Sequence, residues 1–137
     1  MINIVEKVLE DIPVMYIKSE TGPSGATEAF SKLEAKLPGL KGRKFYGLIF
    51  GSPPSLEYWS SVSLFPDDNP GLLGFQTWTI PGGRYAQTKL MNWSQSLEQI
   101  PVLFDQLTQN YKVDRERPSI EFYRSLDELL LRISIRE

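Results

Sequence analysis

The order of strands and helices repeats along the chain, and this repeat constrains the fold more than any other feature of the sequence. Each half begins with Ile-Pro and a tyrosine-containing strand, then continues with an amphipathic helix and two strands. The first half covers residues 12–65 and the second covers residues 80–135. Residue identity between the halves is low, so the repeat is one of architecture. We therefore predict an α+β fold with two duplicated βαββ units.

The expected elements follow from hydrophobic periodicity and from turn residues. Strands are predicted at 14–19, 44–50, 56–65, 72–79, 84–91, 117–125 and 129–135, and helices at about 26–37 and 97–111. Ser96 and Gln99 could form a capping box, although Pro101 favours a later start for the second helix. Residues 66–71 are expected to form a turn. Both helices should cover one face of an antiparallel sheet and leave the other face free to curve around something.

The residue types that are missing limit the chemistry open to the chain. There is no Cys and no His among the 137 residues. Disulfides, thiol nucleophiles, His-based metal sites and His-assisted serine chemistry are therefore excluded. Neither "PDDNPG" nor "IPGG" has the spacing of a calcium or nucleotide loop, so no metal or cofactor is expected. Aromatic stacking and carboxylate electrostatics are the main chemical tools left.

Charge and hydropathy bound the partners of the chain. The net charge is −2 with scattered basic residues, which is unlike the basic footprint of nucleic-acid binding. No apolar run approaches the length of a membrane span, and no signal peptide is evident. A single domain over residues 1–137, located in the cytoplasm, is the expectation. The sequence leaves a homodimer open.

A carboxylate stands in the middle of an aromatic strand, "RPSIEFYRS", at residues 117–125. Side chains alternate along a strand, so Glu121 and Tyr123 oppose Ile120 and Phe122. We expect Ile120 and Phe122 to join the core, on the same side of the sheet as the leucines and isoleucines of the last strand. Glu121 and Tyr123 would then lie on the free face. The alternative is an exposed carboxylate that pairs with Arg132 or Arg136.

Other aromatic residues are candidates for the same free face. The strand at 56–65 places Trp59 among serines, which suits a stacking surface, and Tyr46 and Tyr85 are further candidates. Trp78 and Trp93 are interpreted as structural. An aromatic cleft with one carboxylate attracts organic cations, each ring contact contributing about 0.5–2 kcal/mol. Because isolating a carboxylate from water is unfavourable, Glu121 would have a raised pKa or would bind a cation.

The motifs "IPGGRYA" and "RPSIEFYRS…LLLRISI" resemble the second half of the GyrI-like domain, the effector-binding domain of AraC- and MerR-type regulators. The motifs "IPVMYIKSETG…AFSKLEAKL" and "KFYGLIFGSPP" resemble its first half. The resemblance covers nearly the whole chain beyond the first ten residues. It implies a ligand cleft between the halves that binds hydrophobic, often cationic compounds. The family's glutamate maps onto Glu121, followed by Tyr123, and its aromatic pair maps onto Tyr58 and Trp59.

Three functions remain open on the sequence. No helix-turn-helix precedes the domain, so we expect a free-standing binding protein for amphipathic or aromatic cations. Some free-standing members resemble hydrolases of cyclopropane-bearing electrophiles, in which Glu121 would be the catalytic residue. A protein–protein module is the third alternative. Haem binding, suggested by the related SOUL-like fold, is disfavoured by the absence of His.

Overall fold

A computed structural model describes residues 2–52 and 54–136 of the chain. Within these residues eight strands form one antiparallel sheet, in the order β1-β6-β8-β7-β3-β4-β2-β5. The strands are β1 (Val5–Leu9), β2 (Ile12–Lys18), β3 (Phe45–Phe50), β4 (Glu57–Ser63), β5 (Gln76–Ile80), β6 (Gly83–Met91), β7 (Ser119–Tyr123) and β8 (Glu128–Ser134). The helices are α1 (Ala26–Lys36), α2 (Pro70–Leu73) and α3 (Gln99–Asn110), with short 3₁₀ turns η1 (Gly22–Gly25) and η2 (Trp93–Gln95).

The predicted duplication is confirmed. The first unit is β2-α1-β3-β4 and the second is β6-α3-β7-β8. In the sheet, β2-β4-β3 mirrors β6-β8-β7, and the two units meet where β3 pairs with β7. The fold class expected from the sequence, α+β with two βαββ units and two helices on one face, is the one observed.

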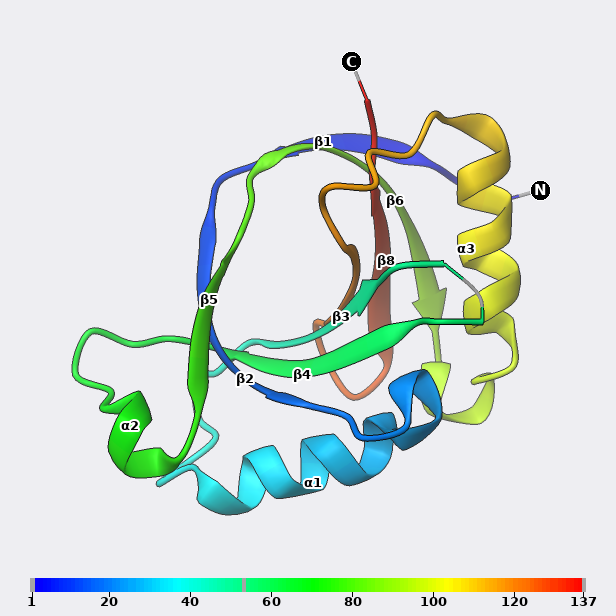
Figure 1. The fold of residues 1–137 in the computed structure, drawn as a ribbon. Coiled ribbons are helices and arrows are strands. Elements are labelled where there is room, and N and C mark those ends of the chain that lie inside the picture. The colour runs from blue at the N-terminus through cyan, green and yellow to red at the C-terminus, as the bar shows by residue number, and fades with distance from the viewer. Residues whose placement is uncertain (1, 53, 137) are drawn as a thin grey trace.

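The sheet curls, and both long helices pack against its outer side (Figure 1). Helix α1 lies over β2 and β4, where Ala29 and Leu33 of the predicted apolar stripe are buried. Helix α3 lies over β6 and β8 through Leu103 and Leu107. We call this side of the sheet the helix-covered face. The central strands β3 and β7 lie between the two helices in the order of the sheet.

The opposite side, which we call the inner face, lies inside the curl. It is not a free surface, because the curled sheet closes on a third apolar cluster there. The buried members of this cluster are Val14, Tyr46, Leu48, Ile80, Tyr85 and Ile120. The partly buried rings of Trp59, Trp78 and Phe122 pack against it. The sheet curves as expected, but it curves around this apolar cluster (Figure 1).

Local differences from the predicted elements have identifiable causes. Helix α3 starts at Gln99 after Glu98, and no side chain caps it, so the capping box is not formed. Pro101 falls in the first turn of the helix, where backbone N–H groups have no partner within the helix. Its missing N–H therefore removes no helical hydrogen bond. Helix α2 covers the end of the turn predicted at 66–71 and the start of the strand predicted at 72–79, and β5 begins only at Gln76. The side chain of Asn69 caps α2.

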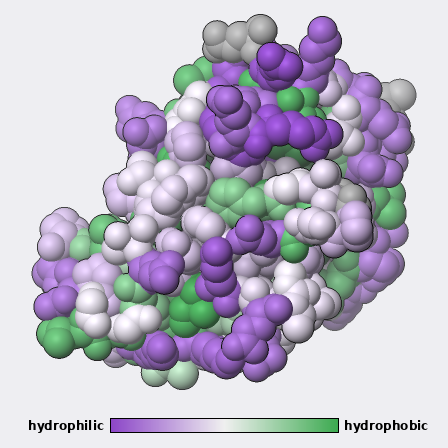
Figure 2. All heavy atoms as spheres, in the orientation of Figure 1, coloured by the Kyte–Doolittle hydropathy of each residue, from purple (hydrophilic) through white to green (hydrophobic). Residues whose placement is uncertain are grey.

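The surface seen from the side of Figure 1 is mostly hydrophilic, with a hydrophobic patch over α2 (Figure 2). Leu72 of α2 is 85% exposed. None of the helices in the described residues combines the length and the apolar character needed to cross a bilayer.

Candidate functional site

Strand register places Glu121 on the helix-covered face, and the predicted placement on the opposite face was wrong. Glu121 pairs with Leu131 and Tyr123 pairs with Leu129 across β7 and β8. Directly paired residues of antiparallel strands share a face. Leu129 and Leu131 belong to the cluster beneath α3, so Glu121 and Tyr123 point the same way. Arg132 lies opposite Ile120 on the inner face, so it does not pair with Glu121 as the alternative assumed.

Gly47 makes room for the carboxylate at the centre of the sheet. It lies opposite Glu121 where β3 pairs with β7. A Cβ at this position would collide with the hydroxyl of Tyr58 and with Oε1 of Glu121. A glycine inside an otherwise apolar strand is a signal of such a close approach. The site therefore lies on the two strands that join the halves of the fold.

Two tyrosine hydroxyls donate hydrogen bonds to the same carboxylate oxygen. Tyr58 on β4 donates to Oε1 of Glu121, and Tyr123 on β7 donates to that atom across 2.7 Å. The two hydroxyl oxygens lie 3.3 Å apart. Glu121 is only 5% exposed. Among the residues that the structure describes, none donates a hydrogen bond to Oε2, and no Lys or Arg forms an ion pair with Glu121.

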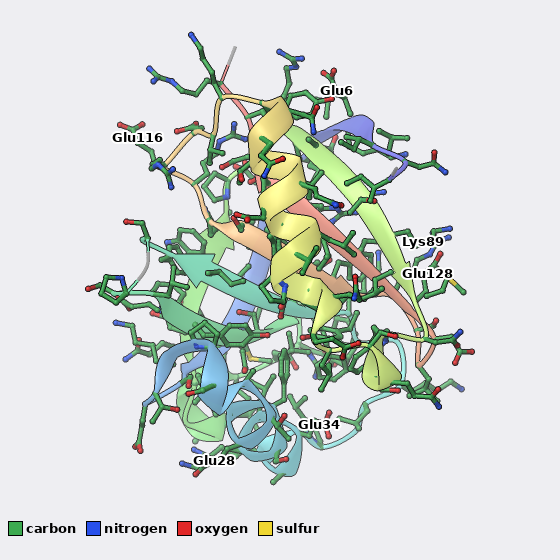
Figure 3. The ribbon with its side chains drawn as sticks, turned by 90° about the vertical axis from the view of Figure 1, so that its right-hand side faces the viewer. Glu6, Glu28, Glu34, Lys89, Glu116 and Glu128 are labelled. Carbon is green, nitrogen blue, oxygen red and sulfur yellow. The ribbon has the colours of Figure 1, made fainter. Side chains whose placement is uncertain are left out.

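Aromatic rings enclose this carboxylate. Phe30 of α1 lies edge-on to Tyr123 and Tyr58, with ring centroids 5.3 Å and 6.2 Å apart. Trp93 of η2 lies edge-on to Tyr123, with ring centroids 5.0 Å apart. Helices α1 and α3 stand apart on this side of the sheet, and side chains fill the space between them (Figure 3). Each half of the fold thus contributes rings to one aromatic enclosure.

Burial controls the ionisation of the three polar groups. Burial raises the pKa of Glu121 above its ordinary value, and the two phenol hydrogen bonds oppose this shift in part. The pKa values of Tyr58 and Tyr123 are raised as well, by burial first and then by the adjacent carboxylate. Both phenols therefore remain protonated hydrogen-bond donors near neutral pH. Of the three groups, the Glu121 carboxyl is the one whose protonation a bound cation can shift.

Sequence reasoning missed three members of this region. Phe30 was assigned to the core stripe of its helix, and Trp93 was interpreted as structural. Ser60 lies opposite Gly47 on the same face, and its buried hydroxyl makes no hydrogen bond within the described residues. The glycine in "KFYGLIF" was the available signal, since it marks the strand position beneath Tyr58 and Glu121.

The predicted ligand residues divide between the two faces. Glu121, Tyr123 and Tyr58 come together on the helix-covered face. Trp59, Tyr46 and Tyr85 lie on the inner face: Trp59 stacks on Tyr16 at 4.1 Å, and Tyr46 stacks on Phe122 at 5.0 Å. Tyr85 donates to the carbonyl of Pro81 across 2.6 Å. The sheet separates Trp59 from Glu121, so these six residues do not form one site.

No family model matches the chain, and no curated protein matches its sequence. Solved structures do match. An integron cassette protein from Vibrio cholerae has a TM-score of 0.70 at 16% identity, covering 97% of this chain and 95% of that one. SAV2435 bound to tetraphenylphosphonium has a TM-score of 0.62 at 11% identity, covering 98% and 94%. The EcmrR C-terminal domain has a TM-score of 0.66 at 9% identity, covering 100% and 99%.

At these identities the likeness concerns the fold. It extends over almost the full length of the chain and of each neighbour. The neighbours and the observed pair of βαββ units agree with the resemblance found in the sequence. The chain therefore folds as a GyrI-like domain.

Proposed function

We propose that this protein binds hydrophobic organic cations at Glu121, between α1 and α3. The observation that carries the proposal is a buried carboxylate with two phenol donors, the rings of Phe30 and Trp93 packed on those phenols, and no ion-pair partner among the described residues. A buried charge of this kind is unfavourable unless it is paired. A delocalised cation supplies the missing charge and contacts ring faces and edges that tolerate many shapes.

Access to the carboxylate requires movement of the rings that cover it. Glu121 is nearly inaccessible, and Phe30 of α1 and Trp93 of η2 pack against the tyrosines that donate to it. A bulky cation reaches Oε2 when one of these rings swings away. Binding is then a population shift toward an open state, and the ligand must bind that state more tightly than the closed one. The tetraphenylphosphonium bound by SAV2435, a protein of the same fold, supports this class of ligand.

Titration with tetraphenylphosphonium, followed by calorimetry, tests the proposal. We expect saturable binding to the wild type and at least tenfold weaker binding to Glu121→Gln, which keeps the shape and removes the charge. The matched control is Glu34→Gln, because Glu34 is exposed on α1 and should not affect affinity. Equal affinity of the wild type and Glu121→Gln would contradict the proposal.

The three tryptophans locate the ligand. Trp93 lies beside Tyr123, whereas Trp59 and Trp78 pack on the inner face. Quenching of fluorescence by bound tetraphenylphosphonium should disappear in Trp93→Phe and persist in Trp59→Phe. The reverse pattern would place the cation on the other face. Turnover of a strained electrophile that is lost in Glu121→Gln would instead support the hydrolase alternative.

A further inference from the structure

The inner face holds a buried cation whose surroundings mirror those of Glu121. Arg132 lies in the middle of β8 and is 8% exposed. Its Nε donates to the side-chain oxygen of Gln87 across 2.8 Å. Among the residues that the structure describes, Arg132 forms no ion pair, and its two Nη groups donate no hydrogen bond. A guanidinium that is this deeply buried is ordinarily paired with an anion.

Aromatic rings surround the guanidinium. Its central carbon lies 5.1 Å from the ring centroid of Phe122, which in turn stacks on Tyr46. The hydroxyl of Tyr46 also has no hydrogen-bond partner within the described residues. Burial lowers the pKa of Arg132; the nearby phenols of Tyr46 and Tyr85 raise it and Arg124 lowers it further. The region therefore has aromatic walls, unused donors and a positive charge.

The unused donors are not fully buried. In the described part of the chain, the fully buried side-chain atoms without a hydrogen-bond partner are Oγ of Ser60 and Oε1 of Gln106. The Nη atoms of Arg132 and the hydroxyl of Tyr46 are not among them, so each of these atoms keeps some solvent-exposed surface. Because Arg132 is only 8% exposed, an anion would approach the guanidinium at these atoms.

We propose that the inner face is a second ligand site, in which Arg132 binds the carboxylate of a planar aromatic acid. A carboxylate matches the planar fork of a guanidinium, and the two free Nη groups can both donate to it. The hydroxyl of Tyr46 is a further donor, and the partly buried ring of Phe122 offers a stacking surface. A single buried cation balances one negative charge, which favours a carboxylate over a phosphate dianion.

This site is independent of the one at Glu121. The two charged side chains come from neighbouring strands but project from opposite faces of the sheet. An aromatic carboxylate is repelled by Glu121, and an organic cation is repelled by Arg132. The two proposals can therefore succeed or fail separately, and the sign of the ligand's charge distinguishes them.

Calorimetric titration with 2-naphthoate tests the second site, with 2-naphthamide as the uncharged match. We expect 2-naphthoate to bind the wild type at least tenfold more tightly than 2-naphthamide, and to bind Arg132→Met at least tenfold more weakly. Arg115→Met, which removes an exposed arginine, should retain full affinity. The proposal is overturned if 2-naphthoate does not saturate the wild type, or if Arg132→Met binds it equally well.

A measurement on the wild type covers the case in which Arg132→Met does not fold. In a 2-naphthoate titration followed by NMR, the Nε–H signal of Arg132 and the side-chain amide of Gln87 should shift together and saturate. Saturating tetraphenylphosphonium should leave this titration unchanged. A separate carboxylate site at Arg132 would be ruled out if these signals do not shift with 2-naphthoate, or if saturating tetraphenylphosphonium abolishes their shift.

Discussion

The two faces of the central sheet each bury one charge, and they bury opposite charges. Glu121 on β7 lies on the helix-covered face, and Arg132 on β8 lies on the inner face. Glu121 pairs with Leu131, the immediate neighbour of Arg132, yet alternation along the strands directs the two side chains to opposite sides. The backbone of the sheet thus keeps a potential ion pair apart, and each charge is left among aromatic rings.

A buried ion pair elsewhere in the molecule shows the contrast. Arg43 and Asp68 form a two-pronged ion pair with donor–acceptor distances of 2.6 Å and 2.7 Å. Their side chains are 5% and 7% exposed. Asp68 also accepts from the backbone N–H of Phe65, so this pair satisfies itself within the protein. The comparison teaches that burial alone does not distinguish the two proposed sites; what they share is burial without a charged partner among the described residues.

The largest effect is expected from filling the space beneath the carboxylate. Gly47→Ala places a methyl group against Tyr58 and Glu121, and overpacking of this kind costs about 2–3 kcal/mol. Urea unfolding measures the change in the free energy of unfolding. Gly39→Ala is the control, because a Cβ at Gly39 meets nothing within 4 Å. Equal stability of the two variants would show that the enclosure is loosely packed.

Breaking the paired charge should have the next largest effect. Asp68→Asn leaves Arg43 covered without its anion, and we expect a loss of about 2 kcal/mol in the free energy of unfolding. The exposed neighbour Asp67 provides the control, since Asp67→Asn should change stability little. If Asp68→Asn is as stable as the wild type, the contrast between paired and unpaired charges disappears.

Removing the charge of Glu121 should act in the opposite direction. The pKa of this carboxyl is raised in the folded state, so its contribution to stability is full below the unfolded-state value near 4.5 and is lost as the pH rises through the folded-state value. Glu121→Gln should therefore be more stable than the wild type at pH 7, by on the order of 1 kcal/mol. The difference in unfolding free energy between the two proteins should grow from pH 4 to pH 8. A difference that is constant over this range would show that Glu121 does not titrate there.

The smallest effect is expected on the inner face. Arg132→Met removes a buried unpaired cation, and we expect a gain of about 1 kcal/mol or less, because Phe122 and Gln87 already stabilise the guanidinium. Although burial lowers the pKa of Arg132, an arginine stays charged throughout the accessible range. Thermal unfolding at several pH values should therefore show a gain that does not vary with pH. If the gain in stability of Arg132→Met varied with pH, Arg132 and Glu121 would no longer differ in their pH dependence.

Hydrophobic periodicity was sufficient to predict most elements of the fold. It located α1 and α3 because Leu33, Leu103 and Leu107 recur at helical spacing on the buried side. It missed β1, whose five residues are mostly exposed and therefore carry no apolar alternation. It also missed α2, which is four residues long and depends on the side-chain cap from Asn69.

The composition of the candidate site was less predictable, because the sequence of one strand does not show which residues of the neighbouring strand it pairs with. Alternation correctly separated Glu121 from Ile120, but the side that each faces depends on whether Glu121 pairs with Leu130 or Leu131. A shift of one residue exchanges the two faces of the whole strand. The same reasoning placed Trp59 with Glu121, whereas the observed pairing brings Tyr58 to the carboxylate instead.

The pairing of β3 with β7 has a consequence for how the protein folds. It joins the two βαββ units, whose other strand pairs, β2–β4, β3–β4, β6–β8 and β7–β8, each lie within one unit. The hairpins β3–β4 and β7–β8 close short loops, whereas the hydrogen bond from Tyr58 to Glu121 spans 63 positions of the chain. Such long-range contacts form late, because the chain loses the conformational entropy of closing a long loop before these contacts can stabilise the fold. The carboxylate would then enter its aromatic enclosure in the last step of folding, and Trp93 fluorescence in a stopped-flow experiment would record the moment at which the two halves dock.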